Sequence, residues 1–262
     1  MIPKIIHCCW FGRNPMGELE NKCINSWKKY CPDYTIKIWN EDNFDINSNA
    51  YVKEAYENKK WAFVTDYVRL YALYTEGGVY MDTDVEVLKS LDDYLKYEAF
   101  SGFENYDAIP TGIMAGVKGF KLYKELLERY IDRHFIDENG RIDYTTNVAE
   151  ITDYCLTRGL KLDNTFQIID GFALFPKDYF CPKSYLTGRI ECTENTITIH
   201  HFRGSWMSKG ERLAISIHTK FSKLGKIGNG LARIICMPIH FVDKVNDLGF
   251  INAIKFFKNR NK

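Results

Sequence analysis

The sequence lacks several features that would place it in a common class at once. It has no apolar run of the roughly 18 residues that a membrane-spanning helix needs. Its 35 Lys and Arg residues nearly balance its 34 Asp and Glu residues, so the net charge of +1 provides no overall attraction to nucleic acid. The phosphate-binding patterns GxxxxGK(S/T) and GxGxxG do not occur, which disfavours a P-loop kinase and a Rossmann dehydrogenase. Any function must therefore be sought in local motifs.

The cysteines lack the arrangement of a disulfide framework. Eight are present without any CxxC spacing, and two of them, Cys8 and Cys9, are neighbours. The first residues, MIPKIIHCCW, lack the charged start, the long apolar segment and the small-residue cleavage site of a signal peptide. We therefore expect reduced thiols and a cytoplasmic protein.

Strand and helix patterns alternate through the first 120 residues. Apolar and polar periodicity predicts strands at 4–10, 34–40, 79–88, 98–104, 111–117, 166–170 and 195–201, and helices at 14–30, 49–59, 61–76, 120–133 and 147–158. Such alternation is typical of an α/β fold with a mostly parallel central sheet. We place this domain at residues 1–210.

The segment EGGVYMDTDVEVL carries the first chemical motif. Gly77 and Gly78 end the predicted helix, and the strand that follows would place Asp82 and Asp84 on one face. Two carboxylates about 4 Å apart repel by about 1 kcal/mol in water and by several times more in a cleft. Mn²⁺ or Mg²⁺ would remove this repulsion, because both ions prefer hard oxygen ligands and share them with substrate phosphates. A solvated strand face is the alternative for an isolated Asp-x-Asp pair.

The helix before this motif adds a second pair. Asp66 and Arg69 are three residues apart and therefore share one helix face, between apolar neighbours. The glycine turn would bring them over the two aspartates. The alternative is a local surface ion pair, usually worth less than about 1 kcal/mol.

Together these residues resemble a known family. AFVTDYVRLYALYTEGGVYMDTDVEVL (62–88), IPKIIHCCWFG (2–12) and HHFRGSWM (200–207) resemble motifs of glycosyltransferase family 32, the group with a DXD sugar-binding region. That family includes capsular-polysaccharide glycosyltransferases and yeast mannosyltransferases, and the catalytic domains of the large clostridial glucosylating toxins look like distant relatives. The resemblance covers about residues 1–210 and implies a GT-A-type fold that binds a nucleotide sugar.

The resemblance also implies roles for individual residues. Asp84 would coordinate the cation, Asp82 would hold the ribose and assist with the cation, and Asp66 and Arg69 would bind the transferred sugar. The expected donor-binding residues are Trp10 on the nucleobase, Tyr80 beside the nucleotide, Ser205 and Trp206 over the diphosphate, and Asn147 near the sugar. Helix capping explains Asn147 equally well.

Three further polar residues need separate expectations. In the stretch HHFRG we favour His201 over His200 as the third metal ligand, by similarity to the His-x-x-Gly of a related retaining family. We expect His7, inside the first strand, to be a structural residue with satisfied hydrogen bonds.

The last segment, 211–262, differs from the rest. From Arg212 onward it holds ten Lys and Arg residues against two acidic residues, a surplus of eight positive charges. Helical patterns at 211–224, 231–245 and 250–259 carry many apolar residues. We expect a basic amphipathic extension that contacts a membrane surface, or alternatively a helical cap on the core.

The resemblance thus implies a metal-dependent, retaining hexosyltransferase of cell-surface polysaccharide synthesis. It would use a UDP- or GDP-sugar and a glycan or lipid-linked acceptor, from the cytoplasmic face of the membrane and with no nucleic-acid partner. One alternative is an effector that glycosylates a protein. The alternative from another class is a nucleotide-sugar-binding module without activity.

Overall fold

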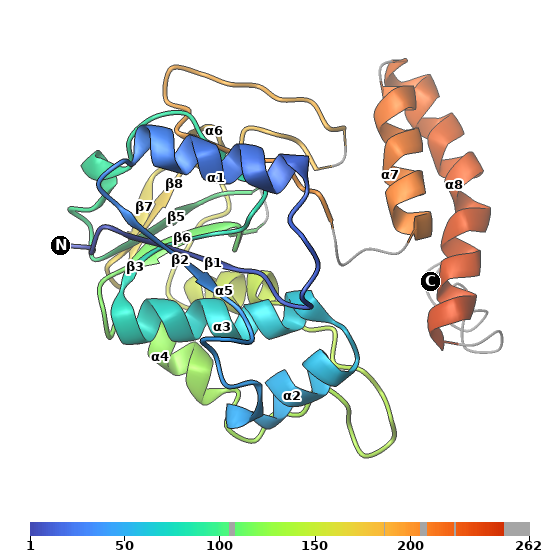
Figure 1. The fold of residues 1–262 in the computed structure, drawn as a ribbon. Coiled ribbons are helices and arrows are strands. Elements are labelled where there is room, and N and C mark those ends of the chain that lie inside the picture. Colours follow the sequence, from blue (N-terminus) through green and yellow to red (C-terminus); the bar gives the residue numbers. More distant parts are fainter. Residues whose placement is uncertain (105–107, 186, 205–208, 223, 249–262) are drawn as a thin grey trace. The chain divides into compact units, whose positions relative to one another are not determined.

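The computed structural model describes residues 1–104, 108–185, 187–204, 209–222 and 224–248 (Figure 1). The chain divides into two compact units. The first comprises residues 1–183 with 191–202, and the second comprises residues 184–190 with 203–262. The boundary expected at residue 210 lies beside the first helix of the second unit and stays a prediction.

The first unit is built on a seven-stranded sheet. Its strands follow the order β2 (Thr35–Trp39), β1 (Ile5–Cys9), β3 (Gly78–Met81), β6 (Ile113–Gly116), β5 (Ala99–Gly102), β8 (Phe172–Phe175) and β7 (Gln167–Ile169). The α/β fold class is confirmed. The sheet is mixed rather than mostly parallel, because β6 runs antiparallel to both β3 and β5, and β7 runs antiparallel to β8.

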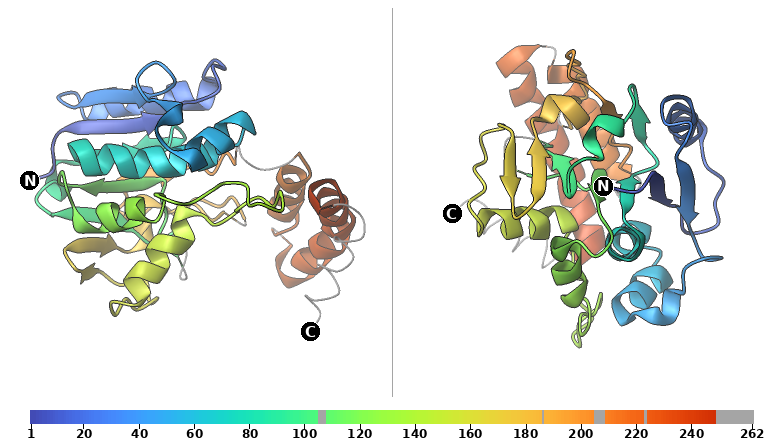
Figure 2. Two further views of the ribbon diagram at one scale, coloured as in Figure 1. Left: turned by 90° about the horizontal axis from the view of Figure 1, so that it is seen from below. Right: turned by 90° about the vertical axis from the view of Figure 1, so that its left-hand side faces the viewer.

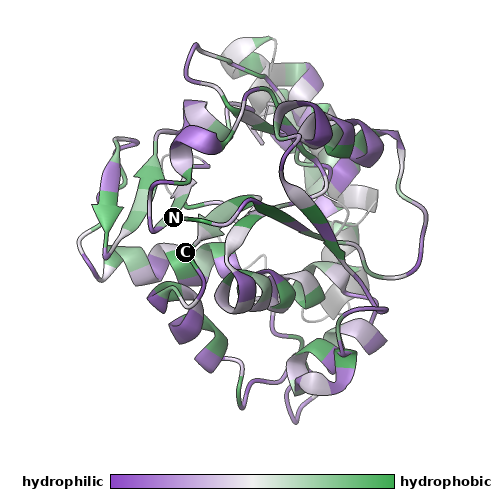
Figure 3. Ribbon diagram, turned by 60° about the vertical axis from the view of Figure 1, so that its left-hand side comes forward, coloured by the Kyte–Doolittle hydropathy of each residue, from purple (hydrophilic) through white to green (hydrophobic). Residues whose placement is uncertain are grey.

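Helices cover both faces of this sheet (Figures 1 and 2). One face carries α1 (Glu18–Tyr30), and the other carries α3 (Trp61–Glu76), α4 (Lys121–Glu128) and α5 (Asn147–Leu156). The remaining helical elements of this unit are η1 (Ile46–Ser48), α2 (Ala50–Glu57), η2 (Asp92–Tyr94) and α6 (Lys177–Phe180). Apolar side chains form a separate core on each face, since successive strand residues point to opposite sides. Figure 3 shows apolar residues concentrated on the central strands.

The motif strand expected at 79–88 is interrupted, which corrects the sequence-based prediction. β3 ends at Met81, and β4 (Val85–Val87) pairs with β9 (Thr198–His200) in a separate two-stranded sheet. A turn joins them, in which the Val85 amide donates to the Asp82 carbonyl at 2.9 Å. Asp82 and Asp84 therefore lie on a turn at the carboxyl end of β3 rather than on one face of a continuous strand.

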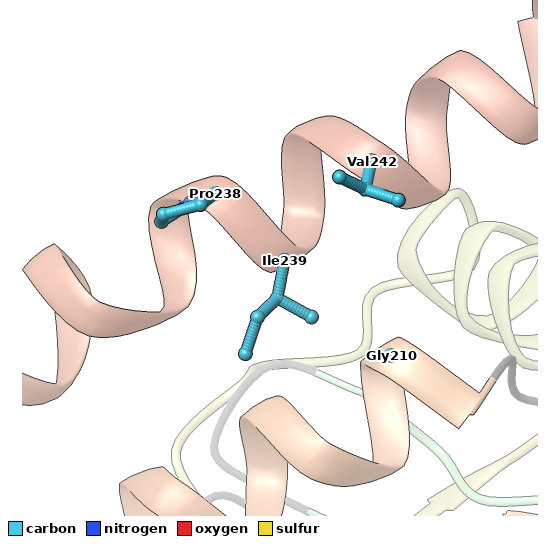
Figure 4. Close-up of a pocket in the computed structure, with 4 residues that line it drawn as sticks. All are labelled: Gly210, Pro238, Ile239 and Val242. Atoms are coloured by element: carbon cyan, nitrogen blue, oxygen red, sulfur yellow. The ribbon is translucent and has the colours of Figure 1, made fainter.

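The second unit contains a helical hairpin of α7 (Lys209–Ser222) and α8 (Gly225–Leu248). Its helices pack through small residues, because Ala214, Ala232 and Cys236 are all buried. Figure 4 shows a small apolar pocket lined by Gly210, Pro238, Ile239 and Val242. Helices were expected at 211–224 and 231–245; the helix expected at 250–259 lies outside the described residues. Among the described helices, none combines the length and apolarity needed to cross a membrane.

Candidate metal centre

Three side chains from distant parts of the sequence meet at one edge of the main sheet. Asp82 follows β3, Asp84 precedes β4, and His200 ends β9, where it lies opposite Val85. One potential ligand atom from each lies within 4.8 Å of the others. His200 Nε2 is 3.3 Å from Asp84 Oδ1 and 3.9 Å from Asp82 Oδ2. Two carboxylates and one imidazole form a suitable donor set for a divalent cation such as Mn²⁺.

The neighbouring histidine takes a different role. His201 Nε2 lies 2.8 Å from Glu86 Oε2, and Lys22 contacts the same carboxylate oxygen at 2.7 Å. Adjacent residues at a strand end point to opposite sides, so only one of the two histidines can face the aspartates. The structure brings His200, rather than the expected His201, beside the two aspartates, and we therefore propose His200 as the third ligand.

His200 has surroundings that suit a metal ligand. Its ring lies against Gly112, where an added Cβ would come 2.6 Å from Nδ1, and its centroid is 4.2 Å from that of Phe202. Nδ1 is buried, and the thiol of Cys181 interacts with the ring. Burial alone lowers the pKa of His200, but the adjacent Asp84 carboxylate raises it well above its ordinary value. A divalent cation would neutralise the negative charge of Asp84, which otherwise favours the protonated form of His200.

Substituting each histidine in turn tests this assignment. We expect His200→Ala to weaken Mn²⁺ binding by about 10- to 100-fold, as a lost ligand or ligand-orienting contact does. His201→Ala serves as the matched control and should change the affinity by less than about twofold. Calorimetric titration with MnCl₂ measures both. Loss of affinity in the His201 variant alone would reverse the assignment.

Arg69 lies between the carboxylates of Asp66 and Asp82 and contacts both. Its Nη2 atom is 3.4 Å from Asp66 Oδ1 and 3.5 Å from Asp82 Oδ1, and its Nη1 atom donates to the Thr111 carbonyl at 2.8 Å. These contacts are buried, because only 5% of the Arg69 surface is exposed. The structure therefore brings Asp66, Arg69 and Asp82 together, and the guanidinium holds Asp82 beside the metal position.

Tyr80 also contacts the Asp82 carboxylate. Its hydroxyl donates to Asp82 Oδ1 at 2.7 Å, and the Arg69 guanidinium lies 4.8 Å from its ring centroid. The side chain is buried, with 1% of its surface exposed. Tyr80 therefore positions Asp82, and its place beside the nucleotide stays a prediction.

Asn147 is likewise a supporting residue. It is fully buried, its Nδ2 atom donates to the Asp66 carbonyl at 2.7 Å, and Tyr130 donates to its Oδ1 atom at 2.9 Å. Thr146, not Asn147, caps α5, because its side chain accepts from Ala149. Asn147 does not cap α5 but fixes the backbone at Asp66, and its contact with the sugar stays a prediction.

The remaining expected residues divide into three groups. Trp10 directly follows β1, which is parallel to β3, so it lies at the same sheet edge as Asp82; its Nε1 donates to the Asn14 carbonyl at 2.6 Å. His7 is structural as expected, because it is buried and bonded through Nδ1 to Trp39 and through Nε2 to Gly77. Ser205 and Trp206 lie outside the described residues.

Sequence reasoning missed the loop before β6. The Thr111 carbonyl accepts from Arg69, and the Gly112 carbonyl accepts from the Asp82 amide at 2.8 Å. Gly112 also leaves room for the His200 ring. The Pro-Thr-Gly turn was a visible signal for a tight loop but gave no indication of its partners.

Comparison with known proteins finds similar sequences. Residues 17–101 match the model of the family described as "glycosyltransferase sugar-binding region containing DXD motif". The chain is 29% identical over 125 residues to inositol phosphoceramide mannosyltransferase 3 of Schizosaccharomyces pombe, covering 45% of this chain and 34% of that protein. It is 26% identical over 161 residues to mannosyl phosphorylinositol ceramide synthase CSH1 of Saccharomyces cerevisiae, covering 56% and 39%. The chain thus spans between a third and two-fifths of the length of these two relatives.

A solved structure is also similar. A glycosyltransferase involved in glycosylation of the major capsid of PBCV-1 has 12% sequence identity and a TM-score of 0.44, with coverage of 80% of this chain and 97% of that one. This similarity is too low to assign site residues, so the candidate site is based on the contacts of this chain's own residues. The matched region 17–101 contains Asp66, Arg69, Asp82 and Asp84. Residues 17–101 of the chain are thus similar to the DXD-containing sugar-binding region of glycosyltransferases.

Proposed function

We propose that this protein is a metal-dependent glycosyltransferase that moves a hexose from a nucleotide sugar to a hydroxyl acceptor. The observation that carries the proposal is the convergence of Asp82, Asp84 and His200 next to the buried Asp66–Arg69 pair. Mn²⁺ or Mg²⁺ at the first three residues would neutralise the diphosphate. Asp66 and Arg69 would then bind hydroxyls of the sugar.

We propose a retaining reaction on one face of the sugar, in which Asp66 is not the nucleophile. Asp66 is held by Arg69 and is 7% exposed, so it is better placed to accept a hydrogen bond than to attack the anomeric carbon. In the proposed course the acceptor oxygen bonds to the anomeric carbon as the bond to the diphosphate breaks. The acceptor proton then passes to a diphosphate oxygen.

The substrates are proposals drawn from the relatives and from the site. Two relatives are named as enzymes that transfer mannose to inositol phosphoceramide, so GDP-mannose belongs among the candidate donors with UDP-hexoses. We propose a glycan or lipid-linked acceptor of cell-surface polysaccharide synthesis, used at the cytoplasmic face of a membrane.

A donor screen tests the proposed function. Nucleotide sugars are added with MnCl₂, and both the melting temperature and the release of nucleoside diphosphate are measured. We expect at least one donor to stabilise the protein by mass action and to be hydrolysed slowly, with both effects abolished by EDTA. Stabilisation without any release would favour the inactive binding module. If no donor gave either effect, the proposal would be wrong.

We further propose that α8 of the second unit contacts anionic lipid. Its exposed apolar residues recur at helical spacing on the side away from the buried Ala232 and Cys236. They include Ile227, Leu231, Ile234, Met237 and Val242. The exposed Arg233 on α8 and the positive surplus of the segment complement negative headgroups.

Vesicle co-sedimentation of the full chain tests this contact. Ile227→Ser with Ile234→Ser should weaken binding to phosphatidylglycerol vesicles by about tenfold or more, because two large apolar side chains no longer enter the interface. Ile131→Ser with Ile168→Ser removes similarly exposed residues from the first unit and should leave binding unchanged. Equal pelleting of both variants and the wild type would exclude α8 as the contact.

A further inference from the structure

Lys183 lies beside the candidate metal centre. Its Nζ atom donates to the backbone carbonyl of His201, the residue directly after His200. The side chain is half-buried, and Asp84 is the acidic group whose charge acts on it. Among the described residues Lys183 forms no ion pair.

Three other lysines of the first unit pair with carboxylates. Lys22 pairs with Glu86 at 2.7 Å, Lys37 with Glu76 at 2.6 Å, and Lys4 with Asp33 at 2.5 Å. A half-buried ammonium that lacks such a partner loses hydration without an equivalent gain, unless an anion binds near it. An anion at Lys183 would also have to bind despite electrostatic repulsion by Asp82 and Asp84.

A metal-bound diphosphate meets this requirement. A divalent cation held by Asp82, Asp84 and His200 makes the site attractive to phosphate oxygens despite the two carboxylates. Lys183 approaches the same group of residues from the segment after α6, and its hydrogen bond to the His201 carbonyl limits its position. The ammonium therefore lies in the region of the candidate cation position, within the electrostatic influence of Asp84.

We propose that Lys183 binds the diphosphate of the nucleotide sugar and offsets the charge of the leaving group. The inference rests on the proposed function. When the bond between the anomeric carbon and the diphosphate oxygen breaks, the electron pair stays on that oxygen, and the nearby ammonium stabilises the added charge. The acceptor oxygen forms the new bond, and its proton moves to the diphosphate.

A purely structural role must be separated from this one. In that role, Lys183 would only brace the carbonyl of His201. Lys89 offers a matched comparison, since its Nζ atom donates to the backbone carbonyl of Glu194 near the other end of the β4–β9 pair. Lys89 is exposed and follows β4, whereas Lys183 lies at the end that carries His200.

The test uses inorganic pyrophosphate as the probe, because every candidate donor contains a diphosphate. Calorimetric titration of the full-length protein measures Mn²⁺ binding alone and then pyrophosphate binding with Mn²⁺ present. We expect Lys183→Met to weaken pyrophosphate binding by about tenfold or more while changing Mn²⁺ affinity by less than about twofold. Lys183→Arg should restore most of the loss, and Lys89→Met should match the wild type.

Each other outcome has a definite meaning. Unchanged pyrophosphate affinity in Lys183→Met would overturn the proposal for Lys183 while leaving the proposed function intact. Parallel loss of Mn²⁺ and pyrophosphate binding would assign Lys183 a structural role and also overturn it. Failure of the wild-type protein to bind pyrophosphate with Mn²⁺ would contradict the metal–diphosphate site itself.

Discussion

Asp84→Asn is expected to lower Mn²⁺-dependent hydrolysis of the preferred nucleotide sugar by about a thousandfold. Asp84 is buried and lies 3.3 Å from His200, so it is a central member of the three-residue cluster. Replacing one carboxylate oxygen by an amide nitrogen removes both a negative charge and a hard ligand. The side chain keeps nearly the same volume, so the fold should be retained.

The measurement is the initial rate of nucleoside diphosphate release at an MnCl₂ concentration that saturates the wild type. Asp153→Asn, at an exposed position on α5, is the matched control and should keep the wild-type rate. Raising the MnCl₂ concentration should recover part of the activity of Asp84→Asn if weak metal binding is the cause. Full activity of this variant at low MnCl₂, or activity insensitive to EDTA, would contradict the role of the metal.

Asp66→Asn is expected to reduce the pH dependence of stability between about pH 4 and 6. Burial raises the pKa of Asp66 to about 6 against the opposing effect of Arg69, from an ordinary value of 3.8. A carboxyl group with a raised native pKa stabilises the fold fully below its unfolded pKa, and this contribution is lost as the pH rises through the native pKa. The difference corresponds to about 3 kcal/mol in the free energy of unfolding.

Urea unfolding at several pH values, with EDTA present, measures this effect. Relative to the wild type, Asp66→Asn should gain up to about 3 kcal/mol as the pH rises from 4 to 7. The paired comparison cancels the titration of the other carboxylates. Asp153→Asn should show no such trend. A constant difference across this range, or one that falls with pH, would show that Asp66 is not desolvated by its surroundings.

The elements that could be predicted are those whose local pattern agrees with the fold. The spacing of apolar residues and the Gly77–Gly78 pair identified α3 and its end, and both glycines have the positive φ values that make glycine suitable there. The proximity of Asp66 and Arg69 to the aspartates followed from this helix–turn–strand order. β8 and α6 were missed, because the FALF segment is buried on both sides and has no alternation.

Other parts of the site could not be predicted from the sequence alone, because they depend on contacts between distant segments. No glycine or proline marks the turn between Asp82 and Asp84, which is stabilised by a backbone bond to the distant Gly112. Alternation predicted that His200 and His201 point apart, but only the pairing of β9 with β4 decides which one faces the aspartates. The positioning roles of Tyr80 and Asn147 depend on contacts across the core.

The central claim is that one divalent cation is held between Asp82, Asp84 and His200. Anomalous diffraction from crystals containing MnCl₂ and a nucleoside diphosphate tests it most directly. We predict a single strong manganese peak within bonding distance of a carboxylate oxygen of Asp84 and of His200 Nε2, with the diphosphate beside it. A peak elsewhere, or a diphosphate bound with no manganese near these residues, would contradict the claim.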